Sequence, residues 1–114
     1  MFARFSAEPG ESFAEVMDEL AAVVAGTHRQ LAVRGHASPE PLPEEHRPAS
    51  HDELAFERAL AVAEALEARG IGPDRVVLST AGAREPRLRT RDPSEQRLND
   101  RVDVFLTDGY APAD

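Results

Sequence analysis

Arg58 is the residue with the clearest capacity to bind a charged group. It lies in a segment rich in Ala, Leu and Glu, a composition that predicts a helix. The four residues three or four positions away on this helix are all uncharged: Leu54, Ala55, Ala61 and Val62. An exposed structural arginine more often has an acidic partner at this spacing. We therefore expect Arg58 to bind an anion beyond its own helix, either a ligand carboxylate or an internal acid such as Asp103 or a loop glutamate.

Three histidines around a proline-rich segment suggest two other kinds of chemistry. His36, His46 and His51 lie near Glu44, Glu45 and Asp52, which as a set would offer zinc ligands. None of their spacings forms a metal-ligand signature, so we predict no metal and no cofactor. His36 also precedes Ser38 by two positions, a spacing that puts a base and a nucleophile on one side of a strand. Because no nucleophile-elbow motif surrounds this serine, we predict that the chain is not an enzyme.

Charge and composition limit the classes of partner. The 114 residues include 13 basic and 21 acidic ones, so the net charge is −8 and disfavours binding to nucleic acid or anionic lipid. All the basic residues are arginine, which excludes Schiff-base lysines and the Walker P-loop. There is no cysteine, and no apolar run approaches the roughly 20 residues that span a bilayer. The segment therefore does not insert into a membrane by itself.

Hydrophobic periodicity predicts two helices and four strands. A first helix follows Ser12, which with Glu15 resembles a capping box, and it ends at Gly26. A second helix extends from Asp52 to Arg69 and ends at Gly70. The strands are expected at residues 2–6, 30–36, 75–80 and 101–107. The predicted order is β-α-β-α-β-β, an α+β two-layer sandwich with helices on one face of a small mixed sheet.

Two irregular segments interrupt this single domain, which we place at residues 1–108. Residues 37–50 hold four of the nine prolines and predict an extended loop. Residues 82–98 carry an arginine-rich stretch that contains Arg84, Arg87, Arg89 and Arg91. Three interpretations are open for this stretch: a solvated loop, a local anion-binding patch, or a surface that pairs with the acidic loop of a neighbouring molecule. Residues 109–114 are expected to form a frayed tail.

Five short strings, in this order, resemble the OmpA-like (MotB-like) peptidoglycan-associated domain. Residues 31–36 (LAVRGH) resemble the strand that ends in Gly-His, and residues 54–59 (LAFERA) resemble the family's Leu-Ser-x-x-Arg-Ala. Residues 70–75 (GIGPDR) match the exit from that helix, and residues 81–86 (AGAREP) the turn after the third strand. Residues 97–104 (RLNDRVDV) are similar to the Asn-Arg-Arg-Val-Glu-Ile that opens the closing strand.

The resemblance implies a binding pocket rather than a catalytic site. In the family, the aspartate after Gly-His-Thr and the helix arginine bind the ionised groups of diaminopimelate in the peptide stem. This chain retains four of the matching residues, His36, Arg58, Asn99 and Arg101. It departs at five positions, where the family usually has Thr, Asp, Asn, Ser and Arg: Ala37, Ser38, His51, Ala55 and Asp100. The implied site has Arg58 as a carboxylate clamp, surrounded by His36, Ser38, His51, Asn99 and Arg101.

The resulting prediction is a noncatalytic domain that binds the peptidoglycan stem peptide. Loss of the carboxylate at Ser38 weakens it, because serine offers an ammonium group only a neutral hydrogen bond. The alternative is a docking module that has kept the fold without the ligand, with a protein partner in a larger envelope or tail-like assembly. A homodimer is a further option. The expected location is the periplasm or cell envelope if an anchor lies in a longer chain, and the cytoplasm if the chain is complete.

Overall fold

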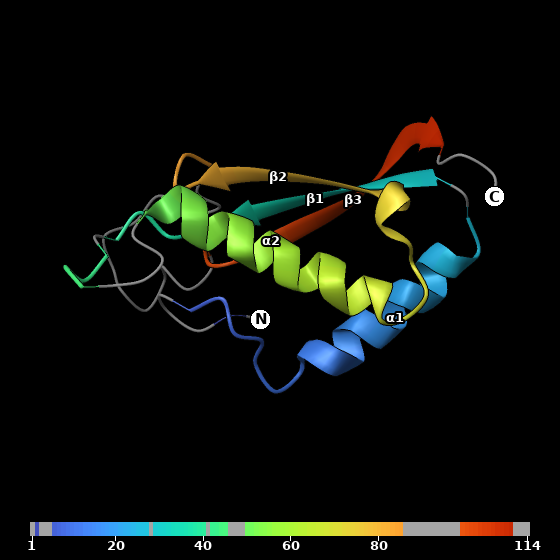
Figure 1. Cartoon of the computed structure of the whole chain (residues 1–114), viewed down its shortest axis with the longest axis horizontal. Helices are drawn as coiled ribbons and strands as arrows, with labels where there is room; N and C mark the ends of the chain where they lie inside the picture. The colour runs from blue at the N-terminus through green and yellow to red at the C-terminus, as the bar shows by residue number, and fades with distance from the viewer. Residues whose placement is uncertain are drawn as a thin grey trace.

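Two helices and three strands form the described part of the molecule. The computed structural model describes Phe2 and residues 6–27, 29–40, 42–45, 50–85 and 99–110. The elements in chain order are α1 (Phe13–Ala25), β1 (Arg29–His36), α2 (His51–Glu67), a short 3₁₀ helix η1 (Pro73–Arg75), β2 (Val76–Gly82) and β3 (Val102–Tyr110) (Figure 1). None of the described helices combines the length and apolar character needed to cross a bilayer.

The sheet has β1 at its centre, in the order β2-β1-β3. β1 is parallel to β2 and antiparallel to β3, so that Val33 lies opposite both Leu78 and Val104. A parallel pair needs a crossover connection, and α2 supplies it. Both helices lie on the same side of the sheet (Figure 1). The predicted α+β class, with a small mixed sheet and helices on one face, is confirmed.

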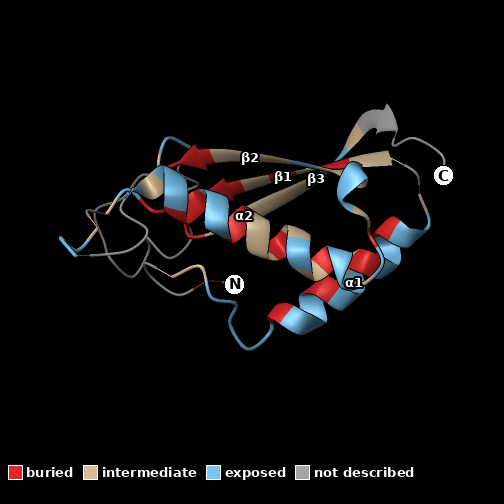
Figure 2. Ribbon diagram, in the orientation of Figure 1, coloured by how far each residue is buried: buried red, intermediate tan, exposed pale blue. Residues whose placement is uncertain are grey.

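The hydrophobic core lies between the sheet and the helices. Leu31 and Val33, on alternate positions of β1, are fully buried and belong to one cluster with Val62 and Leu66 of α2 and Met17 of α1. Figure 2 shows that buried residues alternate with exposed ones along both helices. Burial of each such side chain contributes about 1.5–3 kcal/mol, so the apolar periodicity of the sequence accounts for the two layers.

Gly35 lets α2 approach β1 closely. A Cβ atom at this position would overlap the carbonyl oxygen of Ala55 and come near the side chain of Ala59. Only glycine therefore permits the N-terminal half of α2 to lie directly on the end of β1. This close approach brings Arg58 to the residues that follow the strand.

Most of the predicted elements are confirmed, with differences at their ends. Ser12 precedes α1, but its side chain makes no capping hydrogen bond, so the predicted capping box is wrong. At α2 the cap is Ser50, whose hydroxyl accepts from the Glu53 N–H at 3.1 Å. β3 continues to Tyr110, into the segment expected to be frayed. The strand predicted at residues 2–6 lies mostly outside the described residues, as do residues 86–98 of the arginine-rich segment.

Candidate functional site

The predicted site residues come from three segments that meet at the carboxyl end of β1. β1 ends at His36 and is followed by Ala37 and Ser38. The His36 N–H donates to the carbonyl of Arg101 at 2.9 Å, and the Ala37 N–H donates to the carbonyl of Gly82 at 2.8 Å. These backbone bonds hold the chain after β1 between the end of β2 and the segment that leads into β3. The N-terminal half of α2 closes the arrangement from the core side.

Arg58 is completely buried and donates hydrogen bonds to internal acceptors. Its Nη1 donates to Oδ1 of Asp100 at 2.6 Å and to the carbonyl of His36 at 3.0 Å, and its Nε donates to the carbonyl of Ser6 at 2.8 Å. The ring of Phe2 lies over the guanidinium, 5.6 Å from Cζ. A ligand carboxylate and an internal acid were the two partners expected for Arg58, and the structure shows an internal acid. The acid is Asp100, not Asp103 or a loop glutamate.

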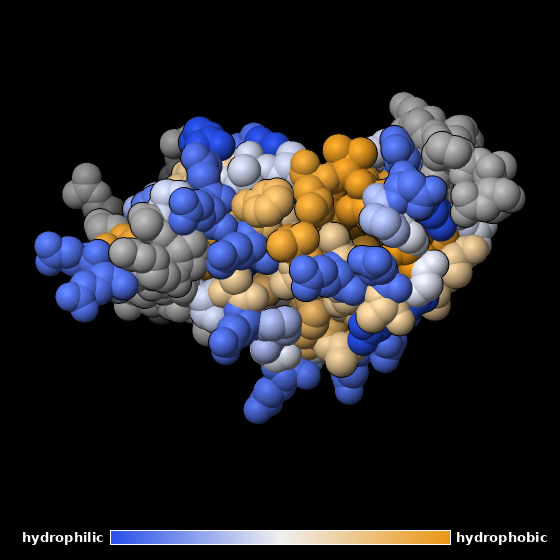
Figure 3. Space-filling view, in the orientation of Figure 1, coloured by the Kyte–Doolittle hydropathy of each residue, from blue (hydrophilic) through white to orange (hydrophobic). Residues whose placement is uncertain are grey.

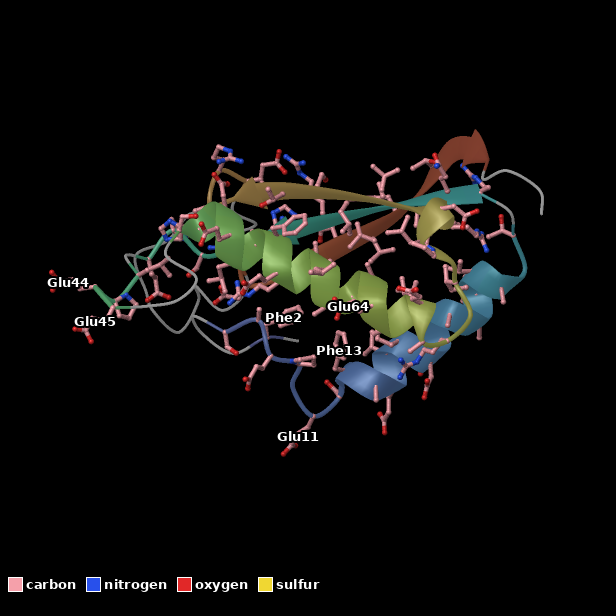
Figure 4. All side chains as sticks on the ribbon, viewed as in Figure 1. Phe2, Glu11, Phe13, Glu44, Glu45 and Glu64 are labelled. Carbon is pink, nitrogen blue, oxygen red and sulfur yellow. The ribbon has the colours of Figure 1, made fainter. Side chains whose placement is uncertain are left out.

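The Phe2 ring that lies over Arg58 is in turn packed against Phe13. Their ring centroids are 6.0 Å apart, and Figure 4 shows both side chains below α2. Both rings are buried. An aromatic face over a desolvated guanidinium is favourable, because the negative face of the ring attracts the cation. Arg58 is therefore in contact with an apolar ring on this side, and its acidic partner is the internal one, Asp100.

Asp100 joins Arg58 to the chain after β1. Its side chain is 3% exposed. Oδ1 accepts both the Arg58 Nη1 bond and the N–H of Ser38, the latter at 3.1 Å. No residue in the described part of the chain donates to the second oxygen, Oδ2. Asp100 thus has one oxygen fixed by two donors and a second that retains the capacity to accept a hydrogen bond.

Positions 38 and 100 differ in charge from the family pattern that the sequence resembles. The resemblance places a carboxylate at 38 and a cation at 100, whereas this chain has Ser38 and Asp100. In the structure, the Asp100 carboxylate reaches the backbone N–H of Ser38 itself. A carboxylate therefore occupies the neighbourhood of residue 38 although none is present in its side chain.

His36 and Arg101 form a second charged cluster, next to the first. Nε2 of His36 lies 2.9 Å from Oδ2 of Asp103, and Nε of Arg101 donates to Oδ1 of the same carboxylate at 3.2 Å. The pKa of the nearly buried His36 is lowered, first by the loss of solvation and then by the positive charge of Arg101. Asp103 and Glu85 oppose this shift without reversing it. The surroundings of His36 thus favour its neutral form.

Arg34 and Glu85 form an ion pair next to this second cluster. The guanidinium of Arg34 binds Glu85 through two hydrogen bonds, from Nε to Oε1 at 2.8 Å and from Nη2 to Oε2 at 3.0 Å. The shared hydrogen bond raises the pKa of Arg34 and lowers the pKa of Glu85. Arg101 also reaches the Glu85 carbonyl, at 3.3 Å. Arg34 is therefore engaged by Glu85, and Arg101 is engaged through Nε and Nη2, while its buried Nη1 has no hydrogen-bond partner among the described residues.

His51 lies beside the proline-rich loop, and Asn99 lies in the interior beside Asp100. Nε2 of His51 lies 2.7 Å from the carbonyl of Glu40, and the Ser38 hydroxyl donates to Oε1 of Glu40 at 3.4 Å. The start of α2 is thereby tied to the proline-rich loop. Asn99 is fully buried next to Asp100. The six predicted residues are thus neighbours, but Arg58 and Ser38 meet at Asp100, while His36 and Arg101 meet at Asp103.

The two alternative chemistries find no support in the described residues. Figure 4 shows Glu44 and Glu45 at the far end of the loop, pointing away from the body of the molecule. Among the residues that the structure describes, no three His, Cys, Asp or Glu side chains come together as metal ligands. His46 of the proposed set lies outside those residues. His36 and Ser38 have different partners, Asp103 and Glu40, so they do not form a base and nucleophile pair.

Asp100 is the residue that the sequence reasoning missed. The resemblance marks it only as a departure from the family pattern, not as a functional group. The signal was present in Arg58: a guanidinium among apolar helix neighbours is buried only if an acid from elsewhere compensates it. An acid adjacent to the retained Asn99 was the natural candidate.

The fold and the composition of this site place the chain in a known class. The family model of the OmpA family matches residues 1–100. The chain belongs to the OmpA family. Comparison with curated protein sequences finds no match.

Solved structures of the same fold resemble it closely. The C-terminal domain of Helicobacter pylori MotB superposes with a TM-score of 0.87 at 24% identity, over 94% of this chain and 82% of that one. The peptidoglycan-associated lipoprotein of Burkholderia pseudomallei gives 0.81 at 20% identity, over 93% and 86%. The cell wall anchor of the type VI secretion system of Pseudomonas aeruginosa gives 0.81 at 24% identity, over 98% and 76%. At these identities the likeness establishes the fold.

Proposed function

We propose that this chain is a noncatalytic module of the cell envelope that binds the peptide stem of peptidoglycan. Its family membership and its likeness to a peptidoglycan-associated lipoprotein and to a cell wall anchor support the class of ligand. The likeness to the periplasmic domain of MotB, with a TM-score of 0.84 at 26% identity, supports a periplasmic location. In this proposal the ligand carries the ionised end of diaminopimelate.

The single observation that carries the proposal is the oxygen of Asp100 that has no donor among the described residues. Arg58 and the Ser38 N–H fix Oδ1 and leave Oδ2 for an ammonium group of the ligand. A charge-assisted hydrogen bond of this kind is about twice as strong as one to a serine hydroxyl. Asp100 thus takes the acidic role that the resemblance assigns to position 38. Arg58 holds Asp100 and does not contact the ligand, which revises the proposed carboxylate clamp.

The test is retention on purified sacculi. Asp100→Asn keeps the shape of the side chain and an acceptor for Arg58, but removes the negative charge. We expect the affinity for sacculi and for free diaminopimelate to fall about tenfold or more. Glu19→Gln is the matched control, since it removes one charge from an exposed position of α1. Circular dichroism verifies that each variant is folded.

The sign of the Asp100→Asn effect separates two modes of binding. If Asp100 accepts the ligand ammonium, the variant binds more weakly. If a ligand carboxylate instead displaces Asp100 from Arg58, loss of the internal acid strengthens binding. Stronger or unchanged binding by Asp100→Asn therefore contradicts the role of Asp100 as the acceptor of the ligand ammonium.

A second candidate function is a docking module that does not bind peptidoglycan. The observation that favours it is the zero exposure of Arg58, whose guanidinium is already compensated inside the protein. This candidate predicts that the folded wild-type domain is not retained on sacculi even at low salt. That result would remove the peptidoglycan proposal and leave the fold as a scaffold for a protein partner.

A further inference from the structure

An apolar groove lies between α2 and β2, away from the Asp100 site. It is a hollow of about 130 Å³ whose apolar lining comes from Leu60 and Ala63 of α2, and from Val76 and Leu78 of β2. Pro73, at the start of η1, also lines the hollow. Figure 3 shows apolar residues gathered over the junction of these two elements. We call this surface the α2–β2 groove.

The groove borders β2, which is the outermost strand on its side of the described sheet. In the described sheet, β2 is paired with β1 on one side and lies at the margin on the other. An edge strand presents N–H and C=O groups that can pair with another extended chain. Val77, on the β2 position between Val76 and Leu78, is 49% exposed. An apolar hollow beside an open strand edge is the arrangement in which an added strand gains both backbone hydrogen bonds and side-chain burial.

Acidic residues of α2 line the same side of the helix. Glu53, Glu57, Glu64 and Glu67 are exposed and are spaced four, seven and three residues apart, which puts them in one stripe. Within the described residues, Glu57, Glu64 and Glu67 form no ion pair with an arginine or histidine. Figure 4 shows Glu64 on the body of α2, and Glu64 and Glu67 also line the groove. Like charges at such spacings repel, so the stripe favours a cationic partner.

The spacing of the stripe defines the partner. Ten residues of helix separate Glu57 from Glu67, a distance of about 15 Å. An extended chain covers this length in about four to five residues, at roughly 3.3 Å each. Side chains two positions apart on a strand point to the same side. A segment with the pattern basic-x-apolar-x-basic thus puts its apolar residue in the hollow and a basic residue near each end.

We propose that the α2–β2 groove binds an extended segment of another protein, which adds to the edge of β2 and carries the pattern basic-x-apolar-x-basic. The apolar side chain contacts Leu60 and Leu78, and the Lys or Arg side chains pair with Glu57 and Glu67. The partner is a basic protein segment, because the acidic stripe repels an acidic one. This function is independent of peptidoglycan binding, since Asp100 and Arg58 do not line the groove.

The test is a selection from a displayed library of random 12-residue peptides. The wild-type chain is expected to enrich peptides with the basic-x-apolar-x-basic pattern. Glu57→Lys, Glu64→Lys and Glu67→Lys together reverse the stripe, and we expect this triple variant to bind the enriched peptides at least tenfold more weakly. The matched control reverses three exposed glutamates of the α1 region, Glu11, Glu15 and Glu19, and keeps the wild-type affinity.

Amide chemical shifts locate the bound peptide. With the best enriched peptide, we expect the largest changes in residues 56–67 and 76–80, and slower hydrogen exchange along β2. Failure to enrich any peptide above the charge-reversed variant would overturn the proposal. Enrichment of acidic peptides, shifts centred on Asp100, or a groove filled by self-association of the chain would each overturn it as well.

Discussion

Nη1 of Arg58 lies 2.6 Å from Oδ1 of Asp100, and the two side chains are 0% and 3% exposed. A charge is tolerated at this depth because each partner compensates the other and both have further hydrogen bonds. The bond joins α2 to the segment before β3, across the end of β1. A fully buried charged group therefore fixes the residues around the candidate site.

Removal of Arg58 is expected to destabilise the fold strongly. Arg58→Ala leaves the Asp100 carboxylate buried without its cation, and loss of one partner of a buried pair costs about 3–5 kcal/mol. The control is Arg84→Ala, because Arg84 and Asp52 form an exposed pair with the similar distance of 2.8 Å. An exposed pair contributes about 0–1 kcal/mol. Urea unfolding measures both, and equal losses of stability would show that burial of the Arg58 pair has no energetic weight.

Replacement of Gly35 is expected to separate α2 from the sheet. In Gly35→Ala, the new methyl group meets backbone atoms of Ala55, which cannot move without shifting the helix. We expect a loss of at least about 1–3 kcal/mol, the usual cost of an overpacked core. At Gly26 the nearest atom to an added Cβ is 3.8 Å away, so Gly26→Ala is the control and should be nearly neutral. A thermal unfolding midpoint that is the same for both variants would contradict the close approach.

The serines that precede the two helices should differ in their effect. Ser50→Ala removes the side-chain acceptor of the Glu53 N–H at the start of α2 and should cost about 1 kcal/mol. Ser12→Ala should be close to neutral, because the Ser12 side chain makes no capping bond. The free energies of unfolding of the two variants check this difference. A greater loss for Ser12→Ala would restore the capping box that the sequence suggested.

The comparison of these two serines indicates what the sequence could predict. The apolar periodicity located both helices to within one or two residues, because burial of one face dominates their energetics. A capping hydrogen bond depends on the backbone dihedral angles of one residue, and the residue type alone does not determine these angles. Ser12 has φ −85° and ψ 0°, whereas Ser50 is extended and can turn its hydroxyl toward the helix.

The same limit applies to the candidate site. The lack of charged helix neighbours correctly predicted that the partner of Arg58 lies beyond its own helix. The identity of that partner was not predictable from local spacing, because Asp100 is 42 residues away along the chain. Asp103 was the wrong choice, since this residue of β3 pairs with His36 at the end of β1 and with Arg101, which directly precedes β3. Contacts between distant segments depend on strand register, which the sequence pattern does not define.

The stability of the domain should depend on pH through His36. Burial lowers the pKa of His36 below its ordinary value of 6.5, so the unfolded chain binds a proton more readily than the folded one. Stability is then fully present above pH 6.5 and is lost as the pH falls through that value toward the lower pKa of the folded state. His36→Gln should remove this part of the pH dependence in urea unfolding between pH 7.5 and 5. His51→Gln is the control and should retain the pH dependence of the wild type. If the free energy of unfolding of His36→Gln changes with pH as steeply as that of the wild type, the pH dependence comes from other groups.

An exchange of charge between positions 38 and 100 tests whether Asp100 has taken over the role of the missing acid. Ser38→Asp alone puts a second carboxylate near Asp100, since the Ser38 N–H is already 3.1 Å from Oδ1. Asp100→Arg alone puts two guanidinium groups together with no acid between them. Both single variants should therefore be destabilised by charge repulsion in a buried setting.

The double variant Ser38→Asp/Asp100→Arg supplies one acid for two arginines and should recover much of the lost stability. Residues in direct contact typically couple by about 0.5–3 kcal/mol, so the two losses should fail to add. Urea unfolding of the wild type, both single variants and the double variant gives this coupling directly. Titration with diaminopimelate then shows whether an acid delivered from position 38 binds as well as one delivered from position 100. If the two losses simply add, the two positions act separately, and Asp100 is no replacement for the acid at position 38.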